Sequence, residues 1–188
     1  FGRAIFKDLI HIGKQKGCSS FLLIATEEGF PLYQKEGFAP EMKYNFYSEP
    51  RSIPEEDVGV HEIQRSTWPQ AWELDKFVTG EDRKGFLEKY SKGALLVKKG
   101  KEIQGVYFPN YGNGSIVALN NEAGLNLLKY RFQENPIKTV LPSSNVAAHD
   151  YLCSLGCKIT GQAYRMCKPK PILWKPECIF SRGTGYGG

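Results

Sequence analysis

The sequence predicts an α/β protein whose mixed sheet is flanked by helices. Three observations support this fold class. Apolar residues recur at helical spacing in several segments, short apolar strands separate these segments, and glycines stand where the helices would end. Hydrophobic residues make up 41% and charged residues 24% of the 188 residues, as in ordinary globular proteins.

The first part of the chain predicts a helix, a strand, a helix and a strand, over residues 1–16, 19–24, 31–36 and 38–47. Gly17 and Gly37 stand where left-handed residues would close the two helices, and Pro31 suits the first turn of the second helix. The continuous apolar run of the first strand implies burial on both faces. Such a half-unit cannot bury its apolar faces alone, so we expect a preceding amino-terminal portion.

A charged segment with two prolines, residues 48–57, lacks periodicity and predicts an interdomain linker. Residues 58–168 then predict a second domain. Its expected helices cover residues 72–77, 81–90, 122–132 and 147–155, and its expected strands cover residues 94–98, 103–108, 115–119, 139–141 and 159–167. The Pro/Gly-rich residues 169–188 predict a tail with one contact point at Ile179 and Phe180.

Lysines and arginines exceed acidic residues by five, 25 against 20, and are spread along the chain. A nucleic-acid binder usually gathers them in one stripe, so we expect no nucleic-acid partner. Solvated faces are the simplest interpretation of these charges, and a mildly positive rim for an anionic cofactor is the alternative. No apolar run approaches the length of a membrane span, and the first residues do not form a signal peptide, which predicts a cytoplasmic protein without a membrane partner.

The five cysteines form no C-x-x-C pair and predict buried free thiols in a reducing compartment. Cys153 and Cys157 have i,i+4 spacing on an expected helix, which could bring their sulfurs near each other. The three histidines are far apart in sequence and no pair has metal-ligand spacing, so no metal is expected. Spacing alone identifies no catalytic triad and no nucleophilic Cys–His arrangement.

Three pieces, G-R-A-I-F-K-D-L-I, F-L-L-I-A-T and P-L-Y-Q-K-E-G-F, resemble the second half of a GNAT-superfamily N-acetyltransferase. The resemblance implies the acyl-CoA N-acyltransferase fold and acetyl-CoA as co-substrate. In that family a loop that opens a long helix holds the pyrophosphate, and the matching residues here are Phe1, Gly2, Arg3 and Ala4. Backbone N–H groups at a helix amino terminus hold a phosphate without a charged side chain.

The resemblance also implies roles around the second helix. Tyr33 matches the family tyrosine that acts as general acid toward the departing thiolate of coenzyme A, and a phenol with a pKa of about 10 is protonated at neutral pH. Thr26 and Gly29 stand ahead of it in a Thr-x-x-Gly form, where the resemblance implies cofactor contacts. The residues alone allow another interpretation, in which Tyr33 anchors a short helix to the sheet.

T-G-E-D-R-K-G-F-L and the later Y-R-M resemble the small GNAT-like accessory domain found behind a catalytic GNAT domain in bacterial proteins. The resemblance covers most of residues 72–168 and implies that residues 58–168 form such a domain. Leu152 stands four residues before Gly156, in the position that Tyr33 has before Gly37 in the first part of the chain. Glu122 at the start of an expected helix would repel a pyrophosphate. We therefore expect this domain not to bind coenzyme A.

Asp82, Arg83 and Arg165 lie in the parts of this second domain that carry the resemblance. One interpretation is a surface ion pair between Asp82 and Arg83, which contributes little to stability. The other is a pocket for an anionic group that Arg83 and Arg165 shape.

The sequence thus predicts an N-acetyltransferase that moves an acetyl group from acetyl-CoA directly to a primary amine, held between the two domains. Tyr33 would protonate the thiolate, and the general base would lie in the missing portion or be water. The alternative is a non-catalytic module that senses acyl-CoA or a small metabolite. We expect this chain to be inactive by itself, and the sequence leaves the acceptor and the oligomeric state open.

Overall fold

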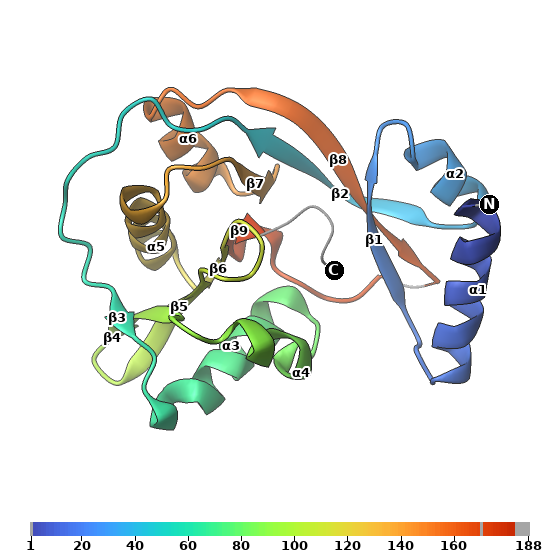
Figure 1. Cartoon of the computed structure of the whole chain (residues 1–188), viewed down its shortest axis with the longest axis horizontal. Helices are drawn as coiled ribbons and strands as arrows, with labels where there is room; N and C mark the ends of the chain where they lie inside the picture. The colour runs from blue at the N-terminus through green and yellow to red at the C-terminus, as the bar shows by residue number, and fades with distance from the viewer. Residues whose placement is uncertain (1, 170, 183–188) are drawn as a thin grey trace.

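Two antiparallel sheets carry the fold in the computed structural model, which describes residues 2–169 and 171–182 (Figure 1). The first sheet has four strands in the order β1–β8–β2–β7, and the second has five in the order β3–β4–β5–β6–β9. The α/β class is confirmed, but a mixed sheet is not found, because every strand pair in the described part of the chain is antiparallel.

The first sheet joins strands from both ends of the chain. Its strands are β1 (Phe21–Thr26), β8 (Ile159–Lys168), β2 (Ala39–Tyr47) and β7 (Thr139–Pro142). β1 and β2 run in the same direction, but β8 lies between them and pairs antiparallel with both. This insertion replaces one parallel pair by two antiparallel pairs, which is the physical reason for the difference from the expected mixed sheet.

Two helices belong to this sheet, α1 (Gly2–Gln15) and α2 (Phe30–Lys35). They lie side by side next to β1 (Figure 1). Phe6 and Ile10 of α1 pack with Phe38 and with the strand residue Phe21 in a small apolar cluster. Only the face of α1 that carries Phe6 and Ile10 packs against the rest of the molecule, so Leu9, outside that face, remains 60% exposed.

The second sheet is covered by helices on both faces. Its strands are β3 (His61–Glu62), β4 (Leu95–Lys99), β5 (Glu102–Phe108), β6 (Ser115–Ala118) and β9 (Ile179–Arg182). The helices are α3 (Trp68–Thr79), α4 (Lys84–Leu87), α5 (Asn121–Glu134) and α6 (Val146–Ser154). Along β5, Tyr107 packs in the cluster of α5 and α6, whereas Val106 and Phe108 pack in the cluster of α3, as strand alternation requires.

Strand β9 falls in the segment expected to be a tail, and the sequence did not predict it. The expected contact point is real, because Ile179 and Phe180 are only 5% and 1% exposed. β9 pairs with β6, and the Thr139 hydroxyl of β7 donates to the Ser181 hydroxyl at 3.2 Å. β9 therefore occupies the space between β6 and β7. The glycine-rich end of the expected tail, 183–188, lies outside the described residues.

Residues 48–57 contain no helix or strand, but they are fastened to the second part of the chain. The Arg51 amide donates to the Leu155 carbonyl at 2.9 Å, and Lys129 pairs with Glu56 at 2.6 Å. The division at residues 47 and 58 stays a prediction. The hydrogen bonds of β8 join the two expected domains in one sheet.

Candidate functional site

The end of β1 and the start of α2 bring three predicted site residues together. The Thr26 hydroxyl accepts from the Gly29 amide at 3.4 Å and donates to the Glu28 carboxylate at 3.2 Å. A Cβ atom on Gly29 would lie 3.3 Å from the Tyr33 ring, so glycine allows the turn to approach the tyrosine closely. Thr26, Gly29 and Tyr33 thus form one local group.

The Tyr33 ring is half-buried in the small cluster beneath α2. Its centroid lies 5.1 Å from that of Phe6 in an edge-on arrangement and 6.3 Å from that of Phe38. These contacts fasten α2 to α1 and to the start of β2, as the anchoring interpretation requires. An anchored ring also holds its hydroxyl in place, so the general-acid role stays a prediction beside it.

The first turn of α1 lies next to the other end of α2. Arg3 donates from Nε to the Glu36 carboxylate at 2.6 Å, and this hydrogen bond lowers the pKa of Glu36. Positive charge from Lys7 and Lys168 acts on the same carboxylate, so three cations surround one anion here. The first turn of α1 has no acidic residue.

The predicted phosphate-binding residues therefore stand in a positive and open environment. Nothing lies within 4 Å of the position that a Cβ atom on Gly2 would take. Gly2, Arg3 and Ala4 present the amino terminus of a 14-residue helix, which attracts anions. Phe1, the fourth predicted residue, lies outside the described residues. The predicted phosphate contact agrees with this local charge and space, and it stays a prediction.

A groove of about 520 Å³ opens beside Thr26, where β1 ends. The lining residues come from β1 and the turn after it, from β2 and β8, and from the segment before β7: Thr26, Glu27, Glu28, Phe46, Tyr47, Lys138, Thr160, Gly161 and Gln162. The groove thus lies between the two expected domains. In the wall of the groove, the side-chain amide of Gln162 donates a hydrogen bond of 2.9 Å to the side-chain oxygen of Asn45. The sequence analysis expected an acceptor site between the two domains but did not identify the residues of this groove, because they are far apart along the chain.

Arg83 and Arg165 do meet, but in an internal ion network. Arg83 binds the buried Asp75 with two hydrogen bonds of 3.0 and 2.5 Å. Arg165 binds Glu41 at 2.8 Å and Glu81 at 3.3 Å. Arg83 and Arg165 line a cavity of about 10 Å³, room for one water molecule, so an organic anion has no space there.

The surface ion pair expected between Asp82 and Arg83 is wrong. Arg83 turns inward to Asp75, and burial of that carboxylate makes this partner the stronger one. Asp82 lies instead 3.7 Å from Lys76. The i,i+8 relation between Asp75 and Arg83 crosses a helix end and left no periodic signal in the sequence.

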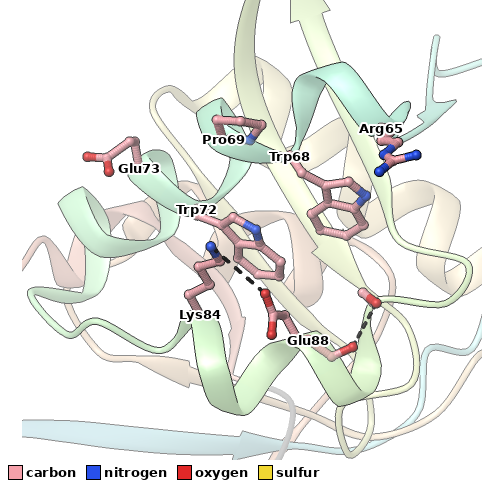
Figure 2. Close-up of a pocket in the computed structure, with 8 residues that line it drawn as sticks. Arg65, Trp68, Pro69, Trp72, Glu73, Lys84 and Glu88 are labelled. Atoms are coloured by element: carbon pink, nitrogen blue, oxygen red, sulfur yellow. Dashed lines mark hydrogen bonds and ion pairs between the residues drawn. The ribbon is translucent and has the colours of Figure 1, made fainter.

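A second hollow, of about 720 Å³, lies on α3 and α4 (Figure 2). The indole rings of Trp68 and Trp72 stack with centroids 4.7 Å apart and form its floor. Arg65, Lys84 and Glu88 stand around the rings, and Lys84 lies 4.0 Å from Glu88. The helix expected over residues 72–77 begins after Trp68, so the sequence analysis did not identify the stacked tryptophans. A signal existed, because two tryptophans four residues apart share one helix face.

In the described part of the chain, no group of three or more His, Cys, Asp or Glu side chains could hold a metal ion. Among the same residues, no helix is both long enough and apolar enough to cross a membrane.

No protein-family profile and no curated protein matches the chain. Solved structures do. A presumed acetyltransferase from Pyrococcus horikoshii matches 100% of this chain with a TM-score of 0.85 and 25% identity, and the match covers 66% of that protein. The chain therefore spans just under two thirds of its length.

Two GCN5-related N-acetyltransferases share the fold at lower similarity. The protein from Anabaena variabilis matches 88% of this chain and 49% of its own length, with a TM-score of 0.53 and 14% identity. The protein from Sphaerobacter thermophilus matches 83% and 62%, with a TM-score of 0.52 and 13% identity. The resemblance predicted from the sequence is confirmed, because the chain is a structural match to GNAT acetyltransferases.

Proposed function

We propose that this chain, as a structural match to GNAT acetyltransferases, carries the coenzyme-binding end of an N-acetyltransferase. The reaction would move an acetyl group from acetyl-CoA directly to a primary amine. The observation that carries this proposal is the group formed by Thr26, Gly29 and Tyr33 at the end of an edge strand. Beside it lies a groove large enough for an acceptor.

The coenzyme would be held from two directions. The amino terminus of α1 and the cations Arg3, Lys7 and Lys168 would attract its phosphates. In the described part of the chain, β1 pairs with β8 alone and leaves its other edge without a strand. Peptide groups at such an edge can bind the amides of an extended arm. When bound, acetyl-CoA supplies an acetyl thioester.

The acceptor amine would enter the groove from the side of Glu27 and Glu28. These two carboxylates outweigh the single cation that lines the groove, Lys138, and would attract a protonated amine. Holding both reactants in one cleft raises the rate by proximity. Tyr33 would donate its proton to the departing thiolate, since its ring is already fixed by Phe6 and Phe38.

The test uses the protein at its natural length, acetyl-CoA and a panel of primary amines. Released coenzyme A should be measured by chromatography, because the exposed Cys18 and Cys153 would react with thiol reagents. Tyr33→Phe should lower turnover at neutral pH by about 100-fold and leave binding of acetyl-CoA unchanged. Tyr164→Phe is the matched control, since Tyr164 also packs beside α2, with its ring 4.9 Å from that of Phe30. Unchanged turnover in Tyr33→Phe refutes the general-acid role.

The second candidate function is a metabolite sensor without turnover. The hollow floored by Trp68 and Trp72 favours it, because stacked indole rings provide a flat binding surface away from the end of β1 (Figure 2). A small aromatic metabolite there would quench tryptophan fluorescence, and Trp72→Leu would abolish the change. A thermal shift with acetyl-CoA, no product with any amine, and such quenching would together favour the sensor over the enzyme.

A further inference from the structure

A thiol and a histidine lie together on α6, on the side that meets β2. Cys153 Sγ is 3.6 Å from Nε2 and 3.9 Å from Nδ1 of His149, within hydrogen-bonding reach of sulfur. Cys153 is exposed, so small molecules can reach it. The structure thus contains a Cys–His pair that the sequence analysis did not identify, because i,i+4 spacing alone does not distinguish it from any other helical pair.

Tyr47 holds the histidine ring from a different element. Its hydroxyl lies 2.8 Å from Nδ1 of His149, although the two residues are 102 positions apart. The Asn45 amide donates to the same hydroxyl at 3.4 Å, and Tyr47 is only 1% exposed. Neutral imidazole has one N–H and one acceptor nitrogen, and a hydroxyl oxygen can accept from that N–H. When Nδ1 carries the proton and donates it to the Tyr47 hydroxyl, Nε2 is left to accept the proton of the Cys153 thiol, and the Nδ1 contact is kept in the imidazolium.

This chain of contacts extends to the groove described above. Gln162, which lines the groove, donates to Asn45 at 2.9 Å, and Asn45 is only 8% exposed. The sequence of partners is Gln162, Asn45, Tyr47, His149 and Cys153. A nucleophile, a base and a group that orients the base are the parts that activate a cysteine.

We propose that Cys153 is a reactive thiol that forms mixed disulfides with small disulfides such as glutathione disulfide. His149 is its proton acceptor, and Tyr47 is a positioning residue that acts through His149. The chemistry is thiol–disulfide exchange, which needs no oxidant beyond the disulfide itself.

The step balances as follows in atoms and electrons. The Cys153 thiol gives its proton to the His149 imidazole, and the resulting thiolate attacks one sulfur of the disulfide. A new S–S bond forms at Cys153 while the old S–S bond breaks. The departing thiolate carries away the electron pair and can take the proton from the imidazolium.

Cys18 and Cys157 provide two internal references. Cys18 is exposed just after α1, and it reports the reactivity of an ordinary surface thiol. Cys157 is buried, and burial raises the pKa of its thiol, so it reports opening of the fold. Cys153 lies in the last turn of α6, and the side chain of His149 is within hydrogen-bonding reach of its sulfur. Without His149 it should therefore react no faster than Cys18.

The experiment measures alkylation by iodoacetamide at pH 7, with the rate at each cysteine followed by peptide mass spectrometry. An ordinary thiol is only a few per cent thiolate at this pH. A fully ionised thiol would therefore be alkylated about five- to tenfold faster, once the lower nucleophilicity of a thiolate with a lower pKa is included. We expect Cys153 to react about fivefold faster than Cys18. His149→Gln should lower the ratio of the Cys153 rate to the Cys18 rate to about one. Tyr47→Phe should lower this ratio to about halfway between five and one.

Incubation with glutathione disulfide should then place the adduct on Cys153 before Cys18. The proposal is overturned if Cys153 and Cys18 react at equal rates in the unaltered chain. It is equally overturned if His149→Gln leaves the ratio unchanged while Cys157 stays protected. Where a variant exposes Cys157, the fold has opened, and the rate ratio in the unaltered chain decides the question.

Discussion

The close contact between α5 and β9 allows a stability prediction with a definite sign. Gly124 is buried in α5, and a Cβ atom there would lie within 3.0 Å of three carbons of the Phe180 ring. In an exposed helix, Gly→Ala stabilises by about 1 kcal/mol. Overpacking in a filled core costs about 1–3 kcal/mol, and the buried Phe180 ring leaves little room to relax. We expect Gly124→Ala to lower the free energy of unfolding by about 2 kcal/mol.

Two further variants isolate this contact. In a Phe180→Ala background the clashing carbons are gone, so Gly124→Ala should become stabilising by about 1 kcal/mol. The coupling free energy between the two positions should then be about 3 kcal/mol. Gly85→Ala is the matched control, because Gly85 is also helical and nothing lies within 4 Å of its Cβ position.

Urea denaturation followed by tryptophan fluorescence measures all four variants. Gly124→Ala should be destabilising, whereas Gly85→Ala should be neutral or slightly stabilising. A stabilising Gly124→Ala in the unaltered background would contradict the position of β9. So would a coupling free energy near zero, because Phe180 would then not lie against α5.

Three other predictions concern buried or paired ionisable groups. Arg165→Met should lower the free energy of unfolding by about 3 kcal/mol in urea, since it leaves the Glu41 carboxylate buried without its cation, and adding Glu41→Gln should restore part of the loss. Burial raises the pKa of Tyr151 to about 12, so the folded state should lose stability as pH rises from about 10 toward that value; Tyr151→Phe should remove this loss in thermal melts. Arg3→Ala should raise the pKa of Glu36 in an NMR titration, and an unchanged value would exclude the Arg3 hydrogen bond in solution. Because the pKa of Glu36 is lowered in the folded state, its contribution to stability is present at neutral pH and is lost as pH falls through the folded pKa.

Local signals predicted most of the helices and strands of the fold. The glycines at 17 and 37 end two helices as expected, and both take the left-handed conformation. The start of α3 was placed four residues late, because Pro69 was not used as a first-turn signal. The expected helix over residues 81–90 is divided into α4 and a 3₁₀ turn over residues 88–90.

The candidate site was predicted only where its residues are close in sequence. Thr26, Gly29 and Tyr33 lie within eight positions, and a single motif indicated all three. The groove beside them and the Cys153–His149–Tyr47 contacts depend on strand order, which no local pattern specifies. Arg83 was assigned to the wrong partner for a different reason, because the chain turns between α3, which carries Asp75, and Arg83, and helical periodicity does not extend across that turn.

Strand order also decides where the candidate site can form. Thr26 stands opposite Ala163 in the pairing of β1 with β8, and β8 is the only partner of β1 in the described part of the chain. The first 47 residues supply the predicted coenzyme contacts, but residues 159–168 complete the sheet that holds them. Because this pairing closes a loop of more than a hundred residues, its loop-closure entropy is unfavourable, and we expect it to form late in folding. A division of the chain at residues 47 and 58 would therefore separate the candidate site from the strand that fixes its geometry, and a fragment cut there should lose the site along with β8.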